Sequence, residues 1–200
     1  MKTAAVRAAT MAAQPNDDAL IAAARAGDHD AFAELFRRHA DQVRTRVTRL
    51  VGPVAERDDL IQQIFLRLFQ TLPAYRGDCA LPTFLYRITV TVSLDHLRSN
   101  RRRIVEPLPD RALEPLVGGE TNQVARAQAR EELRTLFRLL EALDAKKRLA
   151  FVLVAVEGMS MAEAGDLVGA RPEAVKQRVL AARRRLQELL AAEGTKGRHE

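Results

Sequence analysis

The chain has 200 residues, of which 47% are hydrophobic, so it can bury the core of one domain or of two small ones. Its formal net charge of +6 favours a polyanionic partner over an acidic small substrate. A single cysteine, Cys79, excludes an internal disulfide, and four scattered histidines give no zinc spacing and no catalytic triad. We therefore predict no metal site and no catalytic residue in these patterns. The lone cysteine fits the reducing cytoplasm.

Membrane insertion is not expected. The longest apolar run, residues 149–156, is far shorter than the roughly 20 residues that a spanning helix needs. Residues 1–15 carry Lys2 and Arg7 but mostly alanine where a signal peptide would have strongly apolar residues. We interpret this stretch as a disordered N-terminal extension or an uncertain start site, with a cleaved targeting peptide as the lesser alternative.

The first half of the chain predicts helices with apolar stripes. Asn16 or Asp17 can cap a first helix that ends at Gly27, and a second runs from about His29 to the Gly52-Pro53 pair. A third begins with acidic residues and ends at Pro73. We expect the apolar residues of the second and third helices to be core; these are Phe32, Leu35, Phe36, Val43, Val47, Leu50, Leu60, Ile61, Ile64, Phe65, Leu68, Phe69 and Leu72.

Residues 81–103 predict one long helix with a basic end. Its apolar residues recur at three- and four-residue spacing, and Pro82 suits a first helical turn. The segment 88–92, ITVTV, alternates like a strand when taken alone, but the helical period continues on both sides of it. A neighbouring stripe is free to face a partner; it consists of Arg87, Thr91, Asp95 and Arg98. The cationic end fits either a phosphate contact or a solvated helix terminus.

Residues 104–120 predict a linker. Proline and glycine suppress regular structure there, and acidic side chains outnumber basic ones. The linker would separate one domain at residues 16–103 from a second at 121–195, with a short tail at 196–200.

The second domain predicts a helix-turn-helix. Two helices, at about 124–143 and 146–156, precede a Ser160-to-Glu163 capping box that opens a short helix to Val168. Gly169 supplies a left-handed turn, and Pro172 begins a final helix with a cationic outer face. This spacing favours DNA binding, although arginine-rich surface helices are often simply solvated.

Both modules, in this order, resemble region 2 and region 4 of the extracytoplasmic-function (ECF, group IV) sigma factors of the sigma-70 family. The resemblance lies in DDLIQQIFLRLFQTLPAYRGDCALPTFLYRITVTVSLDHLRSNRRR and GMSMAEAGDLVGARPEAVKQRVLAARRRLQELL, and covers roughly residues 17–192. It implies an all-α fold of two small helical domains and a protein that binds bacterial core RNA polymerase and promoter DNA to initiate transcription. It also implies an anti-sigma factor as a partner, no enzymatic activity, no cofactor and no small-molecule substrate.

The resemblance assigns three sets of residues. The polymerase-binding set is Asp58, Asp59, Gln62, Gln63, Phe65 and Arg67. The set for the −10 element is Tyr75, Arg76, Phe84, Arg87, Thr91, Asp95, Arg98, Arg101 and Arg102. The set for the −35 element is Arg171, Glu173, Lys176, Gln177, Arg178, Arg183 and Arg184.

Two departures from the family pattern support an alternative. Gln63 stands where glutamate is usual, and Thr91 stands where asparagine is usual. The alternative is a sigma-like helix-turn-helix regulator that binds DNA without docking productively on polymerase. A third hypothesis, an enzyme that uses Cys79, lacks a base placed near that thiol by any motif.

Overall fold

The computed structural model describes residues 16–99, 113, 116–117 and 122–196. Every regular element within these ranges is helical, which confirms the predicted all-α fold. The elements are α2 (Asp17–Arg25), α3 (His29–Val51), α4 (Arg57–Thr71), the 3-10 turn η1 (Leu72–Ala74), α5 (Leu81–Ser99), α6 (Gln123–Glu141), α7 (Ala145–Phe151), the π-helical η4 (Val152–Val156), α8 (Met161–Val168) and α9 (Pro172–Lys196).

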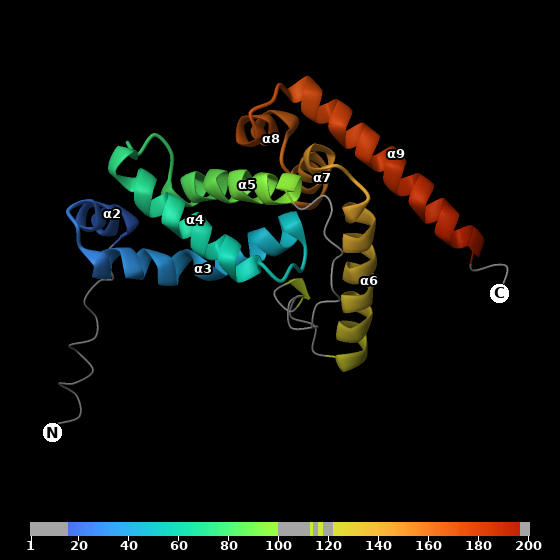
Figure 1. Cartoon of the computed structure of the whole chain (residues 1–200), viewed down its shortest axis with the longest axis horizontal. Helices are drawn as coiled ribbons and strands as arrows, with labels where there is room; N and C mark the ends of the chain where they lie inside the picture. Colours follow the sequence, from blue (N-terminus) through green and yellow to red (C-terminus); the bar gives the residue numbers. More distant parts are fainter. Residues whose placement is uncertain (1–15, 100–112, 114–115, 118–121, 197–200) are drawn as a thin grey trace.

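The helices form two groups that contact each other. Helices α2 to α5 pack together at one end of the molecule, and α7, α8 and α9 pack together at the other (Figure 1). Helix α5 lies between the groups, because it packs on α3 and α4 and also contacts α7 and α8. Within the described ranges, no helix is long and apolar enough to cross a membrane.

Local capping sets most helix boundaries where the sequence predicts them. The Asn16 side chain accepts a hydrogen bond from the Ala19 N–H at 2.9 Å, which caps α2. Ser160 and Glu163 form the predicted capping box at the start of α8. Gly169 ends α8 in the left-handed conformation, with φ of 63°.

Helix α5 confirms the helical interpretation of the ITVTV segment. The hydroxyls of Thr89 and Thr91 donate to the carbonyls of Leu85 and Arg87, both at 2.9 Å, so the polar groups of this β-branched run are satisfied inside the helix. The described helix ends at Ser99. The basic residues 101–103 lie outside the described residues.

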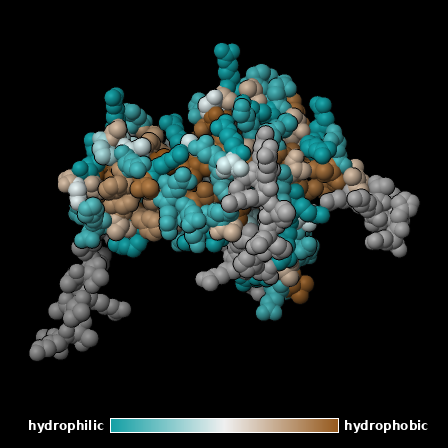
Figure 2. All heavy atoms as spheres, viewed as in Figure 1, coloured by the Kyte–Doolittle hydropathy of each residue, from teal (hydrophilic) through white to brown (hydrophobic). Residues whose placement is uncertain are grey.

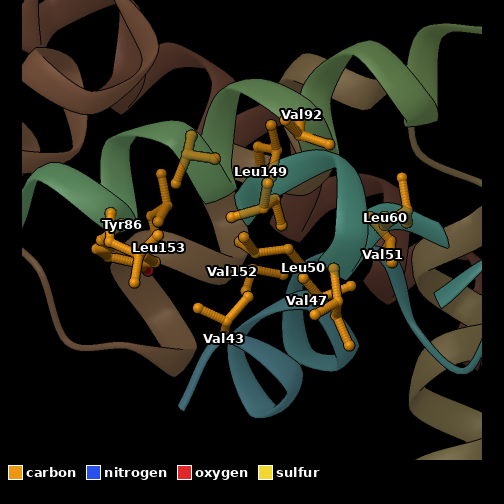
Figure 3. Packing of buried hydrophobic residues seen from close by; sticks show 14 of the residues in the cluster. Val43, Val47, Leu50, Val51, Leu60, Tyr86, Val92, Leu149, Val152 and Leu153 are labelled. Carbon is orange, nitrogen blue, oxygen red and sulfur yellow. The ribbon is translucent and has the colours of Figure 1, made fainter. Parts of the chain in front are cut away.

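A continuous hydrophobic core joins both groups of helices. Val43, Val47 and Leu50 from α3 face the segment that contains Leu149 and Leu153 (Figure 3). All five side chains are at most 1% exposed. Leu113 and Val117, from the predicted linker, are also buried in this core. The two groups therefore share apolar surface that separate domains would expose to water.

Two aromatic residues that we predicted to be core are partly exposed. Phe36 is 38% exposed and Phe69 is 41% exposed. The prediction was wrong because helical periodicity tells which residues share a face but not how far a neighbouring helix extends over that face.

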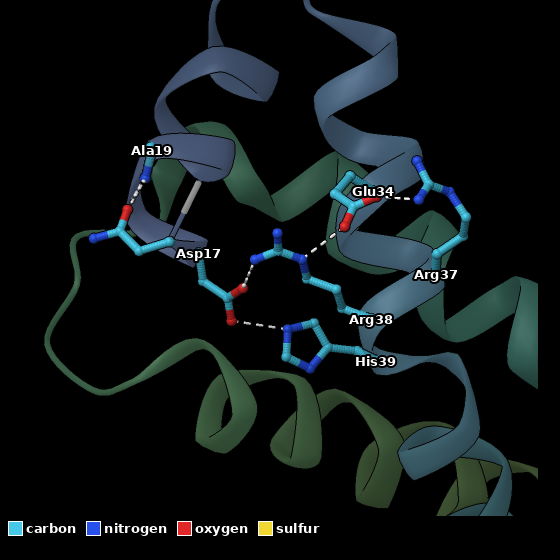
Figure 4. Close-up of polar contacts among 7 residues, drawn as sticks. Asp17, Ala19, Glu34, Arg37, Arg38 and His39 are labelled. Carbon is cyan, nitrogen blue, oxygen red and sulfur yellow. Dashed lines mark hydrogen bonds and ion pairs between the residues drawn. The ribbon is translucent and has the colours of Figure 1, made fainter. Parts of the chain in front are cut away.

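A polar network fastens α2 to α3 (Figure 4). The Arg38 guanidinium donates to Glu34 Oε1 at 2.8 Å and to Asp17 Oδ1 at 3.4 Å, while His39 Nε2 lies 2.9 Å from Asp17 Oδ2. The hydrogen bond from Arg38 is the largest cause that lowers the pKa of the Glu34 carboxyl. The network holds the short helix α2 in place beside η1, which leads to the loop before α5.

Gly52 is a point of close contact between the two groups. Its φ of 82° and ψ of −173° lie in a region that is essentially restricted to glycine. A Cβ added there would lie 3.0 Å from Arg148 Nη2 and 3.1 Å from Phe137 Cδ1. A side chain at this position would therefore force the Phe137 ring of α6 and the Arg148 guanidinium of α7 to shift by a few tenths of an ångström.

We predict that Gly52→Ala lowers the free energy of unfolding by about 2 kcal/mol, since backbone strain and steric overlap add. Gly27→Ala is the matched control, because Gly27 also has a positive φ of 95° but its added Cβ would meet nothing within 4 Å. Urea unfolding of both variants measures the difference. Equal losses would contradict a packing role for Gly52.

Candidate functional site

The outer face of α4 presents polar side chains in consecutive turns. Asp58, Asp59, Gln62 and Gln63 are all exposed, as the resemblance to the family requires of a docking surface. The spacing of three and four residues places them on one stripe of the helix. The two carboxylates lie in the first turn, where the helix dipole favours negative charge.

Exposed apolar side chains continue this stripe. Leu66 is 55% exposed, and together with Phe36 and Phe69 it forms what we call the aromatic patch. The Phe36 ring lies 4.5 Å from the ring of Phe65, centroid to centroid. Hydrophobic residues are visible at the surface where α3 and α4 lie side by side (Figure 2). Sequence reasoning missed this patch as a functional surface, although Leu66 follows Gln62 by four residues and so continues its stripe.

Two predicted polymerase-binding residues are less accessible. Phe65 is only 3% exposed, so its ring supports the aromatic patch from beneath rather than offering a surface of its own. Arg67 is half-buried, and its guanidinium lies 3.5 Å from the Asp95 carboxylate. This ion pair connects α4 with α5, and thus the predicted polymerase-binding and −10 sets.

The loop before α5 is ordered by an aromatic pair. The Tyr75 ring lies 5.0 Å from the ring of Phe84, and the Tyr75 hydroxyl donates to the carbonyl of Cys79. Burial is the largest cause that raises the pKa of the Tyr75 phenol. Arg76 is exposed at the tip of the loop. The pair thus holds a half-buried aromatic surface next to a cation.

The predicted outer stripe of α5 faces solvent. Arg87, Thr91, Asp95 and Arg98 are all exposed. Arg98 Nη1 lies 3.8 Å from Asp95 Oδ1, so Asp95 is shared between two arginines. The predicted residues Arg101 and Arg102 lie outside the described residues.

Helices α8 and α9 form the predicted helix-turn-helix. Gly165 is needed for the tight turn, because a Cβ there would lie 2.5 Å from the carbonyl oxygen of Ala170. On the outer face of α9, six of the seven predicted −35 residues are exposed and Arg178 is half-buried; the exposed ones are Arg171, Glu173, Lys176, Gln177, Arg183 and Arg184. Lys176 Nζ lies 3.5 Å from Glu173 Oε1, a solvent-exposed pair that a phosphate can displace.

The described residues contain no cluster of three or more histidine, cysteine or acidic side chains that could hold a metal ion. Their chemistry is that of binding surfaces: an acidic and apolar face on α4, an aromatic and cationic face at α5, and a cationic face on α9. Such surfaces recognise a protein and a nucleic acid.

Comparison with known proteins points to the same assignment. Residues 35–103 match the family model for Sigma-70 region 2, and residues 133–186 match the model for Sigma-70 region 4. The chain is 36% identical over 176 residues to the ECF RNA polymerase sigma factor SigM of Mycobacterium tuberculosis H37Rv, covering 88% of this chain and 85% of SigM. It is 30% identical over 181 residues to the ECF RNA polymerase sigma-E factor of Escherichia coli K12, covering 86% and 93% of the two chains.

A solved structure shares the fold. CnrH, determined in complex with the cytosolic domain of CnrY, superposes with a TM-score of 0.59 at 28% identity, covering 88% of this chain and 97% of CnrH. The matched families span both helical groups in the order that the sequence predicts. The chain therefore belongs to the ECF RNA polymerase sigma factors of the sigma-70 family.

Proposed function

We propose that this chain is a promoter-specificity subunit that joins bacterial core RNA polymerase in the cytoplasm, recognises the −35 and −10 elements and initiates transcription without being an enzyme itself. The observation that carries the proposal is the outer face of α4, where two exposed carboxylates precede exposed apolar side chains. A protein partner of opposite charge could match the carboxylates of this face and bury its apolar area, and both interactions favour specific binding.

The role we assign to each part of the α4 face follows from its chemistry. Asp58 and Asp59 would attract a basic surface of the polymerase. Leu66, Phe69 and Phe36 would be buried against it, and a fully buried side chain of this kind contributes about 1.5–3 kcal/mol. Gln62 and Gln63 lie between the charged and apolar parts and would supply neutral hydrogen bonds.

The aromatic and cationic surface at α5 suits a separated DNA strand. Unpaired bases stack on aromatic rings while cations follow the backbone, so the Tyr75–Phe84 pair and Arg76, Arg87 and Arg98 would bind the opened −10 element. Asp95 would orient Arg67 and Arg98 for these contacts. Thr91 would contact the strand through its hydroxyl.

The outer face of α9 would lie in the major groove of the −35 element. Residues at the start of a recognition helix contact base edges, and cations further along contact phosphates. We therefore assign Arg171, Lys176, Gln177 and Arg178 to bases and nearby phosphates, and Arg183 and Arg184 to the backbone.

A protein inhibitor is the second partner that we propose. The relative CnrH is held in a complex with the cytosolic domain of CnrY. An anti-sigma factor would cover the apolar α4 face and the cationic α5 face of our chain, which leave hydrophobic and charged surface exposed to solvent.

We expect Asp58→Arg/Asp59→Arg to abolish co-elution with sigma-free core polymerase, a loss of at least about tenfold in affinity, or roughly 1.4 kcal/mol. The matched control is Asp30→Arg, which also reverses an exposed acid in the first turn of a helix. If the intact chain binds DNA but not polymerase, the alternative regulator, which the neutral Gln63 suggests, becomes the correct function.

The aromatic patch makes a separate prediction. Leu66→Gln should weaken polymerase binding by about fivefold, near 1 kcal/mol, because it removes apolar area that docking would bury. Thermal stability should change little, since Leu66 is already 55% exposed. Val124→Gln on α6 is the control, because Val124 is 74% exposed and outside the proposed interface. Unchanged affinity for Leu66→Gln would exclude the patch from docking.

For α9, Lys176→Ala should weaken binding of the polymerase complex to a −35-containing duplex and reduce the salt slope of log K by about one. Lys146→Ala on α7 removes a lysine that is also exposed and should leave the slope unchanged. The slope is measured by fluorescence anisotropy at several salt concentrations. An identical slope in both variants would argue against a phosphate contact by Lys176.

A further inference from the structure

A cavity lies between the start of α5 and helix α8. Its volume is about 270 Å³, slightly less than the roughly 300–1,000 Å³ of pockets that hold drug-sized molecules. Four of the residues that line it are exposed; these are Thr83, Arg87, Glu163 and Asp166. A molecule about the size of an amino acid can therefore enter this cavity from solvent.

The cavity keeps positive and negative charges on opposite walls. Arg46 of α3 and Arg87 of α5 line one wall, and Glu163 and Asp166 of α8 line the other. Neither guanidinium forms an ion pair with a carboxylate of the described residues. The four formal charges cancel, so the cavity favours a ligand that carries both signs over a simple anion or a simple cation.

Arg46 is half-buried and is held in place by its neighbours. The centre of its guanidinium lies 4.3 Å from the centre of the Tyr86 ring, a cation–π contact. Its Nη1 lies 3.4 Å from the Pro82 carbonyl oxygen, which is long for a hydrogen bond. Burial is the largest cause that lowers the pKa of Arg46, because little water is left to solvate the charge. A carboxylate placed beside Arg46 would compensate for this lost hydration.

The two acids of α8 differ in how available they are. Glu163 Oε2 accepts hydrogen bonds from the Ser160 N–H at 2.9 Å and from the Ser160 hydroxyl at 2.7 Å, and the hydroxyl is the largest cause that lowers the pKa of Glu163. Asp166 is exposed and forms no ion pair within the described ranges. Asp166 is therefore the carboxylate that a protonated amine would find free.

The remaining lining residues suit the middle of such a ligand. Met159 and Leu167 are half-buried and offer apolar surface to a short hydrocarbon segment. The Tyr86 side chain is 6% exposed, and its hydroxyl has no hydrogen-bond partner among the described residues. The residues that line the cavity thus include an unused donor as well as two unpaired cations.

We propose that this cavity binds a small zwitterion with a carboxylate at one end and a protonated amine at the other. The carboxylate pairs with Arg46 and Arg87, and the amine pairs with Asp166. Because Arg87 also belongs to the surface that we assign to the −10 element, the bound ligand competes with the DNA backbone for this cation. This regulatory step rests on the proposed promoter-binding function, whereas binding of the zwitterion does not.

Isothermal titration calorimetry of the full chain with 6-aminohexanoate tests the site. We expect saturable binding with a dissociation constant on the order of 1 mM or below. The amino acid leucine is an isomer of this probe whose two charged groups sit on one carbon atom, and hexanoate lacks the amine. Both should bind at least about tenfold more weakly. No saturable binding, or equal affinity for the three compounds, would overturn the proposal.

Variants of the full chain test whether the probe binds in this cavity. Asp166→Asn and Arg46→Gln should each weaken binding of 6-aminohexanoate by at least about tenfold. Arg44→Gln is the matched control, because it removes another half-buried arginine of α3 that does not line the cavity. Circular dichroism checks that Arg46→Gln is folded, and the exposed Asp166→Asn decides the matter if it is not. Unchanged affinity of Asp166→Asn would contradict the assignment.

Promoter-dependent transcription with core polymerase tests the regulatory step. Saturating 6-aminohexanoate should lower transcription by the natural chain about threefold, the effect of losing one exposed ion pair. Asp166→Asn should transcribe equally with and without the probe. No response of the natural chain, or equal inhibition of both chains, would overturn the competition for Arg87. If the chain fails to transcribe even without the probe, the proposed function is wrong, and calorimetry still decides whether the cavity binds a zwitterion.

Discussion

The contact between Arg148 and the end of α3 determines how the rest of the structure is arranged. The Arg148 guanidinium donates to the Leu50 carbonyl through Nε, and the missing side chain of Gly52 leaves room for its Nη2. Around this contact, apolar residues of both helical groups merge into one core. The buried cation, the Arg49–Glu157 ion pair and the shared core together fix how the two helical groups sit relative to each other.

The side chains that this core leaves exposed form the proposed binding surfaces. Helices α4 and α5 each bury one stripe of apolar side chains and expose another stripe. The exposed stripe of α4 is acidic and then apolar, which suits a protein partner, whereas that of α5 is mainly cationic and adjoins an aromatic pair, which suits a nucleic acid. The Arg67–Asp95 ion pair couples the two.

Local features of the fold could be predicted from the sequence, and long-range ones could not. The capping box at Ser160 and the left-handed Gly169 follow from interactions within a few residues, so their sequence signals are direct. The exposure of Phe36 and Phe69 depends on where neighbouring helices end. The burial of Arg148 depends on a carbonyl 98 residues away, for which no sequence pattern exists. Among the candidate functional residues, the polar stripes of α4 and α5 could be predicted from helical spacing. The aromatic patch could not, because its exposure depends on how far neighbouring helices extend.

The most direct test of this account is the distance between the start of α5 and α8 in the free chain, measured by double electron-electron resonance. In a Cys79→Ser background, spin labels would be placed on Thr83→Cys and Asp166→Cys, two exposed positions that line the same cavity. The account predicts one short, narrow distance distribution, because the two helical groups share a core. A broad distribution that extends over tens of ångströms would contradict it.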